Sequence, residues 1–293
     1  ISAAEVGAGP ALTSDAAYVE LTRFFTDHQI LVPQLLFDAR ERKLLLIEDL
    51  GDTLIGNLIG KVGEPKLRQI YSAAIEQLIR IQSIPPIPAQ LPFSRAFSRD
   101  LFFKEMMETA DFFLPAFDNS EALKAAVVSH LQELAQQVDS LPKVLAHRDF
   151  HSWNLMWWQE RLRVIDFQDA LLAPRTYDLI SLLHDRDTDK ALGEPLVNEI
   201  RSLYSQRTNY GSEFPLEYRL TLLQRDLKVV GRFAKLVTVR KLPQYAKWIP
   251  GTYNRVISGL RAVSELAGES RWREFAESLD AVVADNPGGP FAR

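Results

Sequence analysis

Two kinds of hydrophobic pattern follow one another along the chain, one with the period of a helix and one made of short apolar runs. Residues 18–28 carry apolar side chains at helical spacing, which predicts a helix. Short apolar runs follow at 34–37 and 43–47, separated by the polar segment 38–42, and they predict a β-hairpin. The first part of the chain therefore predicts one helix followed by two paired strands.

Helical spacing dominates from Pro65 onward. One interruption is clear, because the runs 155–158 and 162–165 flank the polar turn 159–161 and predict a second hairpin. A long region that is rich in helices thus follows a short region that contains a hairpin. The helices predicted in this long region span residues 67–79, 99–113, 121–138, 177–184, 192–205, 217–239, 250–266 and 272–283.

Composition narrows the class of protein. A chain of 293 residues with 46% hydrophobic and 25% charged residues can bury a full core, as one large or two modest domains. Charges interrupt every apolar run well before the ~18 residues of a membrane span, so we expect no membrane partner. The net charge of -4 gives no reason to expect nucleic acid as a partner. The absence of cysteine excludes disulfides, thiol catalysis and thiolate metal sites, and it fits our expectation of a cytoplasmic protein.

The segment H-R-D-F-H-S-W-N, from His147 to Asn154, carries the clearest chemical signal. Asp149 and Asn154 have the H-R-D-x-x-x-x-N spacing of kinase catalytic loops, in which the Asp accepts the substrate hydroxyl proton and the Asn holds Mg²⁺. Asp166 follows a short β-branched run, where the metal-binding Asp of D-F-G would lie, although D-F-Q stands here. The hairpin between Asn154 and Asp166 would bring these two ligands to the same end of a ribbon. Together the residues predict phosphoryl transfer.

Phosphoryl transfer explains why these residue types occur together. Its loose transition state is stabilised mainly by positioning and by metal ions. Mg²⁺ prefers hard oxygen ligands, keeps several waters and takes only one or two protein carboxylates. Asn154 and Asp166 meet that requirement, and Asp149 is the candidate catalytic residue.

Two histidines near Asp149 need a separate interpretation. His147 could act as a general base, but we favour a structural role in which it packs and hydrogen-bonds the loop. His151 lies four residues later, a spacing that can bind zinc on a helix. The segment lacks the Glu of H-E-x-x-H and shows no evident third ligand, so we discount zinc.

These motifs resemble the aminoglycoside phosphotransferase and choline kinase superfamily. Within it, I-D-F-Q-D-A from Ile165 and P-R-T-Y-D-L from Pro174 are similar to the anomeric sugar kinases that phosphorylate N-acetylmuramate and N-acetylglucosamine in bacterial cell-wall recycling. The block L-Q-R-D-L-K-V-V-G-R-F-A from Leu223 resembles the same subgroup. The resemblance runs from about residue 17 to about residue 265 and is strongest between Val144 and Asp185.

The resemblance implies an α+β, two-lobed, protein-kinase-like fold. Residues 1–50 would form a small, partial N-lobe whose helix and hairpin lead to a hinge, and residues 51–293 a large helical C-lobe with the catalytic loop and the metal site. The hinge, which binds adenine through its backbone, would comprise Glu48, Asp49 and Leu50. The alternative interpretation of this segment is a strand that ends in an acidic turn without a binding role.

The resemblance also implies supporting and substrate-binding residues. Asp178 would cap a helix and accept backbone N–H bonds from the catalytic loop. Glu105 and Arg225 are candidate sugar contacts, and Asp169 is a candidate contact of the sugar or the metal. The competing interpretations are an ordinary turn carboxylate for Asp169 and ordinary exposed charges for Glu105 and Arg225.

The implied activity is a kinase that uses ATP and Mg²⁺. Its partners would be the nucleotide and an amino sugar whose anomeric hydroxyl becomes the sugar 1-phosphate in peptidoglycan recycling. A kinase for an aminoglycoside, choline or another small alcohol would use the same Asp149 and metals, so that alternative stays open. The sequence does not specify the oligomeric state.

The phosphate-covering loop and strand-borne Lys of the family are not evident before Tyr18. Gly7-Ala8-Gly9 does not continue into G-x-G-x-x-G, and the chain begins with Ile1. We expect that the first strands of the small lobe were removed or lie outside this numbering. Glu20 is then the candidate partner of the Lys. If the N-lobe were truly absent, the chain would be a nucleotide-binding module without catalysis.

Overall fold

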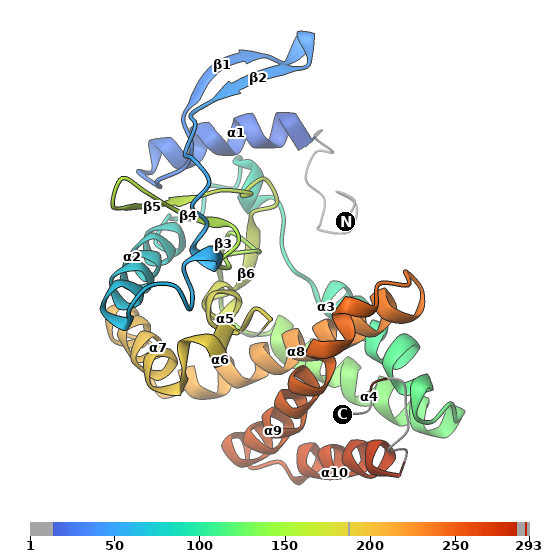
Figure 1. Ribbon diagram of the computed structural model, residues 1–293. Helices are drawn as coiled ribbons and strands as arrows, with labels where there is room; N and C mark the ends of the chain where they lie inside the picture. Colours follow the sequence, from blue (N-terminus) through green and yellow to red (C-terminus); the bar gives the residue numbers. More distant parts are fainter. Residues whose placement is uncertain (1–13, 187, 286–290, 292–293) are drawn as a thin grey trace. The chain divides into compact units, whose positions relative to one another are not determined.

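The computed structural model describes residues 14–186, 188–285 and 291, so the predictions at Gly7, Gly9 and Ile1 lie outside the described residues. The described chain is mainly helical and holds six short strands in three antiparallel pairs (Figure 1). This content of helices and strands confirms the predicted α+β class. The chain divides into two compact units, one formed by residues 1–97 with 142–210 and the other by 98–141 with 211–293. The functional boundary predicted after residue 50 stays a prediction.

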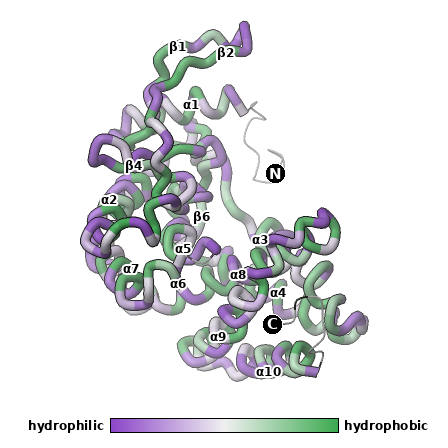
Figure 2. The backbone as a smooth tube through the Cα atoms, in the orientation of Figure 1, coloured by the Kyte–Doolittle hydropathy of each residue, from purple (hydrophilic) through white to green (hydrophobic). Residues whose placement is uncertain are grey.

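The first unit begins with helix α1 (Ser14–Asp27) and the predicted hairpin of β1 (Leu35–Ala39) and β2 (Leu44–Ile47). A 3₁₀ turn at Arg40–Arg42 closes the hairpin, and Lys43 ends it in the left-handed conformation. The strands are hydrophobic and the tip is hydrophilic (Figure 2). Several apolar side chains of the hairpin are exposed, namely Leu36, Phe37, Leu44, Leu46 and Ile47.

Two further strand pairs lie in the first unit. Strands β3 (Lys143–Ala146) and β6 (Leu171–Pro174) pair, a pairing that the sequence pattern did not predict. Strands β4 (Leu155–Trp158) and β5 (Arg161–Val164) form the predicted second hairpin. The helices of this unit are α2 (Glu64–Gln82), α5 (Tyr177–His184), α6 (Thr188–Leu192) and α7 (Glu194–Thr208), with 3₁₀ turns at Ile55–Asn57 and Leu91–Phe93.

The packing of α2 shows why its sequence forms a helix here. Pro65 stands in its first turn, where a missing N–H costs nothing. Its apolar residues at spacings of three and four face inward and are buried, whereas Arg68 on another face pairs with Glu64. The buried residues are Leu67, Ile70, Tyr71, Ala74, Ile75, Leu78 and Ile81.

The second unit is a bundle of helices. Its members are α3 (Arg99–Glu108), α4 (Glu121–Asp139), α8 (Phe214–Thr238), α9 (Ile249–Ala267) and α10 (Ser270–Ala284), with 3₁₀ segments at Leu114–Ala116 and Pro243–Trp248. Each predicted helix of this unit is present. One prediction needs correction, because α3 ends at Glu108 and a π-helical turn covers Thr109–Phe113.

A close crossing of α3 and α8 accounts for that π-helical turn. A Cβ at Gly231 would lie 2.2 Å from the Thr109 nitrogen, so α8 approaches the backbone of α3 directly. The Thr109 hydroxyl also donates to the Leu227 carbonyl. A regular helix gives way to the wider turn at this crossing, and sequence period alone does not reveal it.

No helix within residues 14–186, 188–285 and 291 is long and apolar enough to cross a membrane.

Candidate active site

The predicted catalytic loop connects β3 to β4, and His147 forms its buried base. The His147 Nε2 lies 2.9 Å from the Ile165 carbonyl and donates to it, while Nδ1 accepts from the Asp149 N–H at 3.3 Å. Burial lowers the pKa of His147 below its usual value, so the ring is neutral and both nitrogens are used within the loop. The geometry agrees with a structural role for His147.

Asp178, in the first turn of α5, holds the start of the same loop. Its carboxylate accepts the backbone N–H of His147 at 2.6 Å and that of Arg148 at 3.0 Å. The predicted bonds to the loop are thus present. The predicted helix cap is not, because Thr176 occupies that position and the Asp178 side chain turns to the loop. These bonds help hold Arg148 at φ 81°, a conformation that side chains rarely adopt.

The second hairpin brings the two predicted metal ligands together. Leu155 pairs with Val164, so Asn154 and Asp166 emerge at the same end of the ribbon. The Asn154 amide donates to the Asp149 carbonyl at 3.0 Å and to Asp166 Oδ2 at 3.3 Å. Asp149, Asn154 and Asp166 therefore form one cluster, with Asp149 half-buried and Asp166 exposed.

The donor atoms of this cluster suit Mg²⁺. Among the described residues, the side chain of Asn154 forms hydrogen bonds only through its amide nitrogen, which leaves the side-chain oxygen for a ligand. Asp166 adds a carboxylate. Among the described residues there is no cluster of three or more His, Asp or Glu that could enclose a metal. Two oxygen donors are a ligand set that Mg²⁺ accepts, since it keeps several of its own waters.

Gln168 is a site residue that the motif analysis missed. Its Nε2 donates to Asp166 Oδ1 at 2.6 Å, so both carboxylate oxygens of Asp166 accept from amides. Asp166 itself has φ 62°, a left-handed conformation that Asp tolerates better than most residues. The signal in the sequence was the Gln in D-F-Q, where the kinase motif has Gly.

The hinge residues divide into two roles. The Glu48 carboxylate pairs with Arg163 at 2.8 Å and accepts the Gln34 N–H at 3.1 Å, so it fastens the first hairpin to β5. Within the described residues, the backbone groups of Asp49 and Leu50 make no hydrogen bonds. They are the groups that a hinge offers to a purine base, and the predicted adenine contact stays a prediction.

A cavity of about 540 Å³ lies beside this hinge. Leu45 and Ile47, on one face of β2, line it together with Tyr18 and Gln168. The Tyr18 ring stacks on Phe167 of the D-F-Q motif, with ring centroids 5.2 Å apart. The cavity therefore joins the strand that leads to the hinge with the turn that carries Asp166, and its size is that of a small-molecule site.

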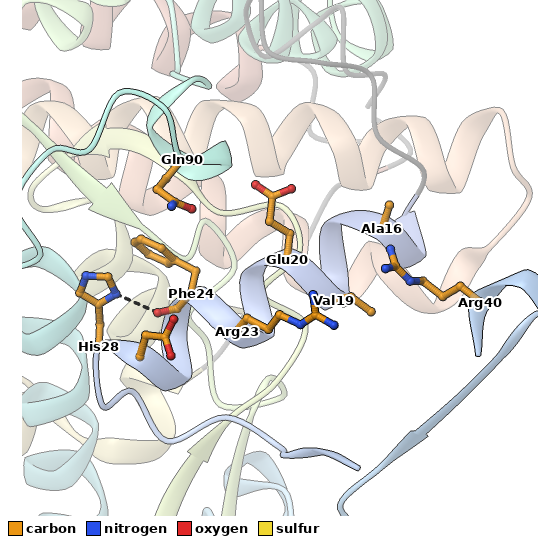
Figure 3. A pocket seen from close by; sticks show the side chains of 9 residues that line it. Ala16, Val19, Glu20, Arg23, Phe24, His28, Arg40 and Gln90 are labelled. Atoms are coloured by element: carbon orange, nitrogen blue, oxygen red, sulfur yellow. Dashed lines mark hydrogen bonds between the residues drawn. The ribbon is translucent and has the colours of Figure 1, made fainter. Parts of the chain in front are cut away.

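Glu20 lines a different pocket, of about 410 Å³, on α1 (Figure 3). Arg23, His28 and Gln90 line it as well, and His28 Nδ1 lies 2.8 Å from the Phe24 carbonyl. The predicted pairing of Glu20 with a Lys stays a prediction.

The three predicted sugar contacts lie in different surroundings. Asp169 follows the D-F-Q turn in the first unit, and its carboxylate lies 3.6 Å from Arg148 Nη1. Glu105 and Arg225 belong to the second unit and are only 6% and 5% exposed, so the interpretation as exposed charges is wrong. Glu105 pairs with Lys228 at 2.9 Å. The predicted contact with a sugar stays untested for all three.

A kinase-like fold with this loop defines a phosphotransferase that transfers phosphate to a hydroxyl acceptor. The family comparison agrees: residues 10–214 match the phosphotransferase enzyme family, APH, so the chain belongs to that family.

Curated relatives are similar along most of the chain. The N-acetylmuramate/N-acetylglucosamine kinase of Neisseria meningitidis serogroup B is 29% identical over 276 residues, covering 89% of this chain and 79% of that protein. The kinase of the same name from Caulobacter vibrioides is 28% identical and covers 80% of this chain and 67% of that protein.

Solved structures show the fold. The ADP-bound aminoglycoside phosphotransferase APH(2'')-Ib superposes with a TM-score of 0.55 at 16% identity, covering 82% of this chain and 80% of that one. A choline/ethanolamine kinase family protein from Mesorhizobium loti superposes with a TM-score of 0.58 at 15% identity, covering 90% of this chain and 83% of that one. These similarities confirm the predicted kinase-like fold.

Proposed function

We propose that the protein is an ATP-dependent sugar kinase that phosphorylates the anomeric hydroxyl of N-acetylmuramate, N-acetylglucosamine or both. The observation that carries the proposal is the cluster of Asp149, Asn154 and Asp166 at one end of the β4–β5 hairpin. The names of the curated relatives support the choice of sugar. The product, a sugar 1-phosphate, would serve peptidoglycan recycling in the cytoplasm.

The residues of the cluster would divide the chemistry between them. Asp149 accepts or orients the proton of the sugar hydroxyl as its oxygen attacks the γ-phosphate in line. Asn154 and Asp166 would hold Mg²⁺ through their side-chain oxygens. When bound, Mg²⁺ neutralises charge on the phosphate oxygens. His147, buried and neutral, keeps the loop in place and takes no proton from the sugar.

Asp149 is oriented for this role by its neighbours. Its backbone N–H donates to His147, and its carbonyl accepts from Asn154 and from the His151 N–H at 2.9 Å. Because the backbone on both sides is fixed, the carboxylate projects from a rigid loop. A base that is already held in position lowers the entropic cost of reaching the transition state.

The nucleotide would lie against the hinge and the cavity beside it. Asp49 and Leu50 offer free backbone groups to adenine, and Leu45 and Ile47 offer an apolar surface. The triphosphate then extends toward Asp166, whose turn also borders the cavity through Gln168.

The acceptor is tested by incubating the full chain and Mg²⁺-ATP with a panel of alcohols: N-acetylmuramate, N-acetylglucosamine, glucose, choline and an aminoglycoside. Phosphorus NMR identifies the product, because a phosphate on C1 couples to the anomeric proton. We expect an anomeric phosphate with one or both amino sugars and with no other acceptor. Phosphate on another alcohol would contradict the proposed substrate, and no transfer at all would contradict the proposed activity.

A further inference from the structure

Two buried arginines hold the turn that follows Asp166. Arg95 is 6% exposed, and its Nη1 donates to the Gln168 carbonyl at 3.2 Å. Arg148 is 7% exposed, and its Nη1 lies 3.6 Å from Asp169 Oδ2. Gln168 and Asp169, which are neighbours in the D-F-Q-D segment, are thus each contacted by one guanidinium group.

The two guanidinium groups have one carboxylate partner between them among the described residues. Among the residues that the structure describes, the Arg95 guanidinium has no carboxylate partner, and its one hydrogen bond goes to a neutral carbonyl. Arg148 has the single carboxylate of Asp169, whose side chain is 58% exposed. A buried cation is costly unless an anion accompanies it. Within the described part of the chain, the Arg95 guanidinium is therefore a buried cation without an ion-pair partner, which an anionic group of a ligand can supply.

The position of the pair relates this charge to the acceptor. Arg148 directly precedes Asp149, and Asp178 accepts the backbone N–H groups of Arg148 and of His147 before it. Its guanidinium lies 5.8 Å from the ring centroid of Phe97, two residues after Arg95. Gln168, whose carbonyl Arg95 contacts, bonds Asp166 through its side chain. Both arginines thus adjoin the residues that would meet the sugar hydroxyl and the metal.

We propose that Arg95, together with Arg148, binds the carboxylate of an acidic acceptor sugar. This inference rests on the proposed function and refines its specificity. N-acetylmuramate carries a lactyl carboxylate on its O3 atom, whereas N-acetylglucosamine has a hydroxyl group there. A guanidinium matches a carboxylate in geometry and charge, so Arg95 favours the acidic sugar over the neutral one.

The test compares kcat/KM for the two sugars in the wild type, Arg95→Met and Arg95→Lys, all as the full chain. For Arg95→Met we expect a loss of about 10- to 100-fold with N-acetylmuramate, mostly in KM, because a charge-assisted bond is made equally in the ground and transition states. With N-acetylglucosamine, which offers no carboxylate, we expect a clearly smaller loss, namely the part that comes from the lost bond to the Gln168 carbonyl alone. Arg95→Lys keeps a cation and retains part of the preference.

A second measurement needs no variant. The methyl ester of N-acetylmuramate keeps the shape of the lactyl group and removes its charge, so the wild type should use the ester about 10- to 100-fold less efficiently than the acid. As a matched control, Arg68→Met removes an exposed arginine that pairs with Glu64 and Glu199, and it should leave both sugars unaffected.

Other results would overturn the proposal. A parallel loss for both sugars in Arg95→Met would mean that Arg95 only supports the D-F-Q-D turn. A weakened affinity for Mg²⁺-ADP in Arg95→Met would assign the pair to nucleotide phosphates. Equal use of the acid and its ester would exclude carboxylate recognition while the sugar kinase activity stands. Failure of the wild type to phosphorylate either sugar would instead overturn the proposed function, and this inference with it.

Discussion

At the scale of single residues, the site depends on side chains that fix one another. Asp166 is bonded by Asn154 on one oxygen and by Gln168 on the other, at 3.3 and 2.6 Å. Asp178 fixes the two peptide N–H groups that precede Asp149. Loss of a group that orients a metal ligand typically lowers metal affinity about 10- to 100-fold. Gln168 is therefore a positioning residue for Asp166.

Gln168→Met tests this positioning. Met keeps the length and volume of Gln but donates no hydrogen bond, so we expect the Mg²⁺ concentration needed for ADP binding to rise about 10- to 100-fold. Calorimetric titration of ADP at a series of Mg²⁺ concentrations measures it, and metal-free ADP binding should not change. Gln132→Met, on an exposed position of α4, is the control. An unchanged Mg²⁺ requirement in Gln168→Met would refute the role.

Sequence reasoning found part of this site and missed the rest for a physical reason. Asp149, Asn154 and Asp166 are separated by fixed spacings, and the local hairpin between them converts spacing into proximity. The contact of Arg95 with the Gln168 carbonyl joins segments 73 positions apart, and no local pattern specifies it. The motif did mark Gln168 as unusual, but its bond to Asp166 follows from the turn conformation.

At the scale of elements, the helices were more predictable than the strands. Amphipathic spacing predicted α5 from Tyr177 to His184 with the observed ends. The β3–β6 pair was missed, because two strands of four residues each gain stability from a distant partner and not from their own pattern. The π-helical turn after α3 was missed too, since it depends on contact with α8.

Gly231→Ala tests the close crossing of α3 and α8. The added Cβ would lie 2.2 Å from the Thr109 nitrogen and 2.3 Å from the Glu108 carbonyl carbon, so the helices must separate. We expect the free energy of unfolding to fall by about 1–3 kcal/mol, as in other overpacked cores. Denaturant unfolding followed by circular dichroism measures it.

The control for that substitution is Gly259→Ala in α9. Its Cβ would lie 3.5 Å from a Leu223 methyl group, an ordinary contact, and Ala favours a helix over Gly by about 1 kcal/mol. This variant should be as stable as the wild type or more so. A Gly231→Ala variant that matched it in stability would contradict the close crossing.

At the scale of the whole molecule, the first unit by itself contains the predicted hinge, Asp149, Asn154 and Asp166. Because its two stretches, 1–97 and 142–210, are separated in sequence, the local pattern could not predict this division.

Stability of this unit should depend on pH through His147, whose burial lowers its pKa. Below the usual His pKa of about 6.5, the unfolded chain therefore binds a proton at His147, whereas the folded chain leaves this ring neutral.

The sign of this pH effect follows directly. Stability is fully present above about pH 6.5, and it falls as the pH drops below that value, by up to about 1.4 kcal/mol per pH unit for this group. Denaturant unfolding between pH 5 and 8 on the wild type and His147→Gln measures it. The variant should have a flatter profile in this range. Identical profiles would show that His147 does not titrate on unfolding.

The most direct test of the account is Asp149→Asn. Asn has the shape of Asp but cannot accept the sugar proton, so we expect kcat for phosphoryl transfer to fall about 10²- to 10⁴-fold. The affinity for Mg²⁺-ADP, measured by calorimetry, should stay within about threefold of the wild type, because the proposed metal ligands are unchanged. A kcat close to that of the wild type would contradict the role of Asp149, and with it the mechanism drawn from the cluster.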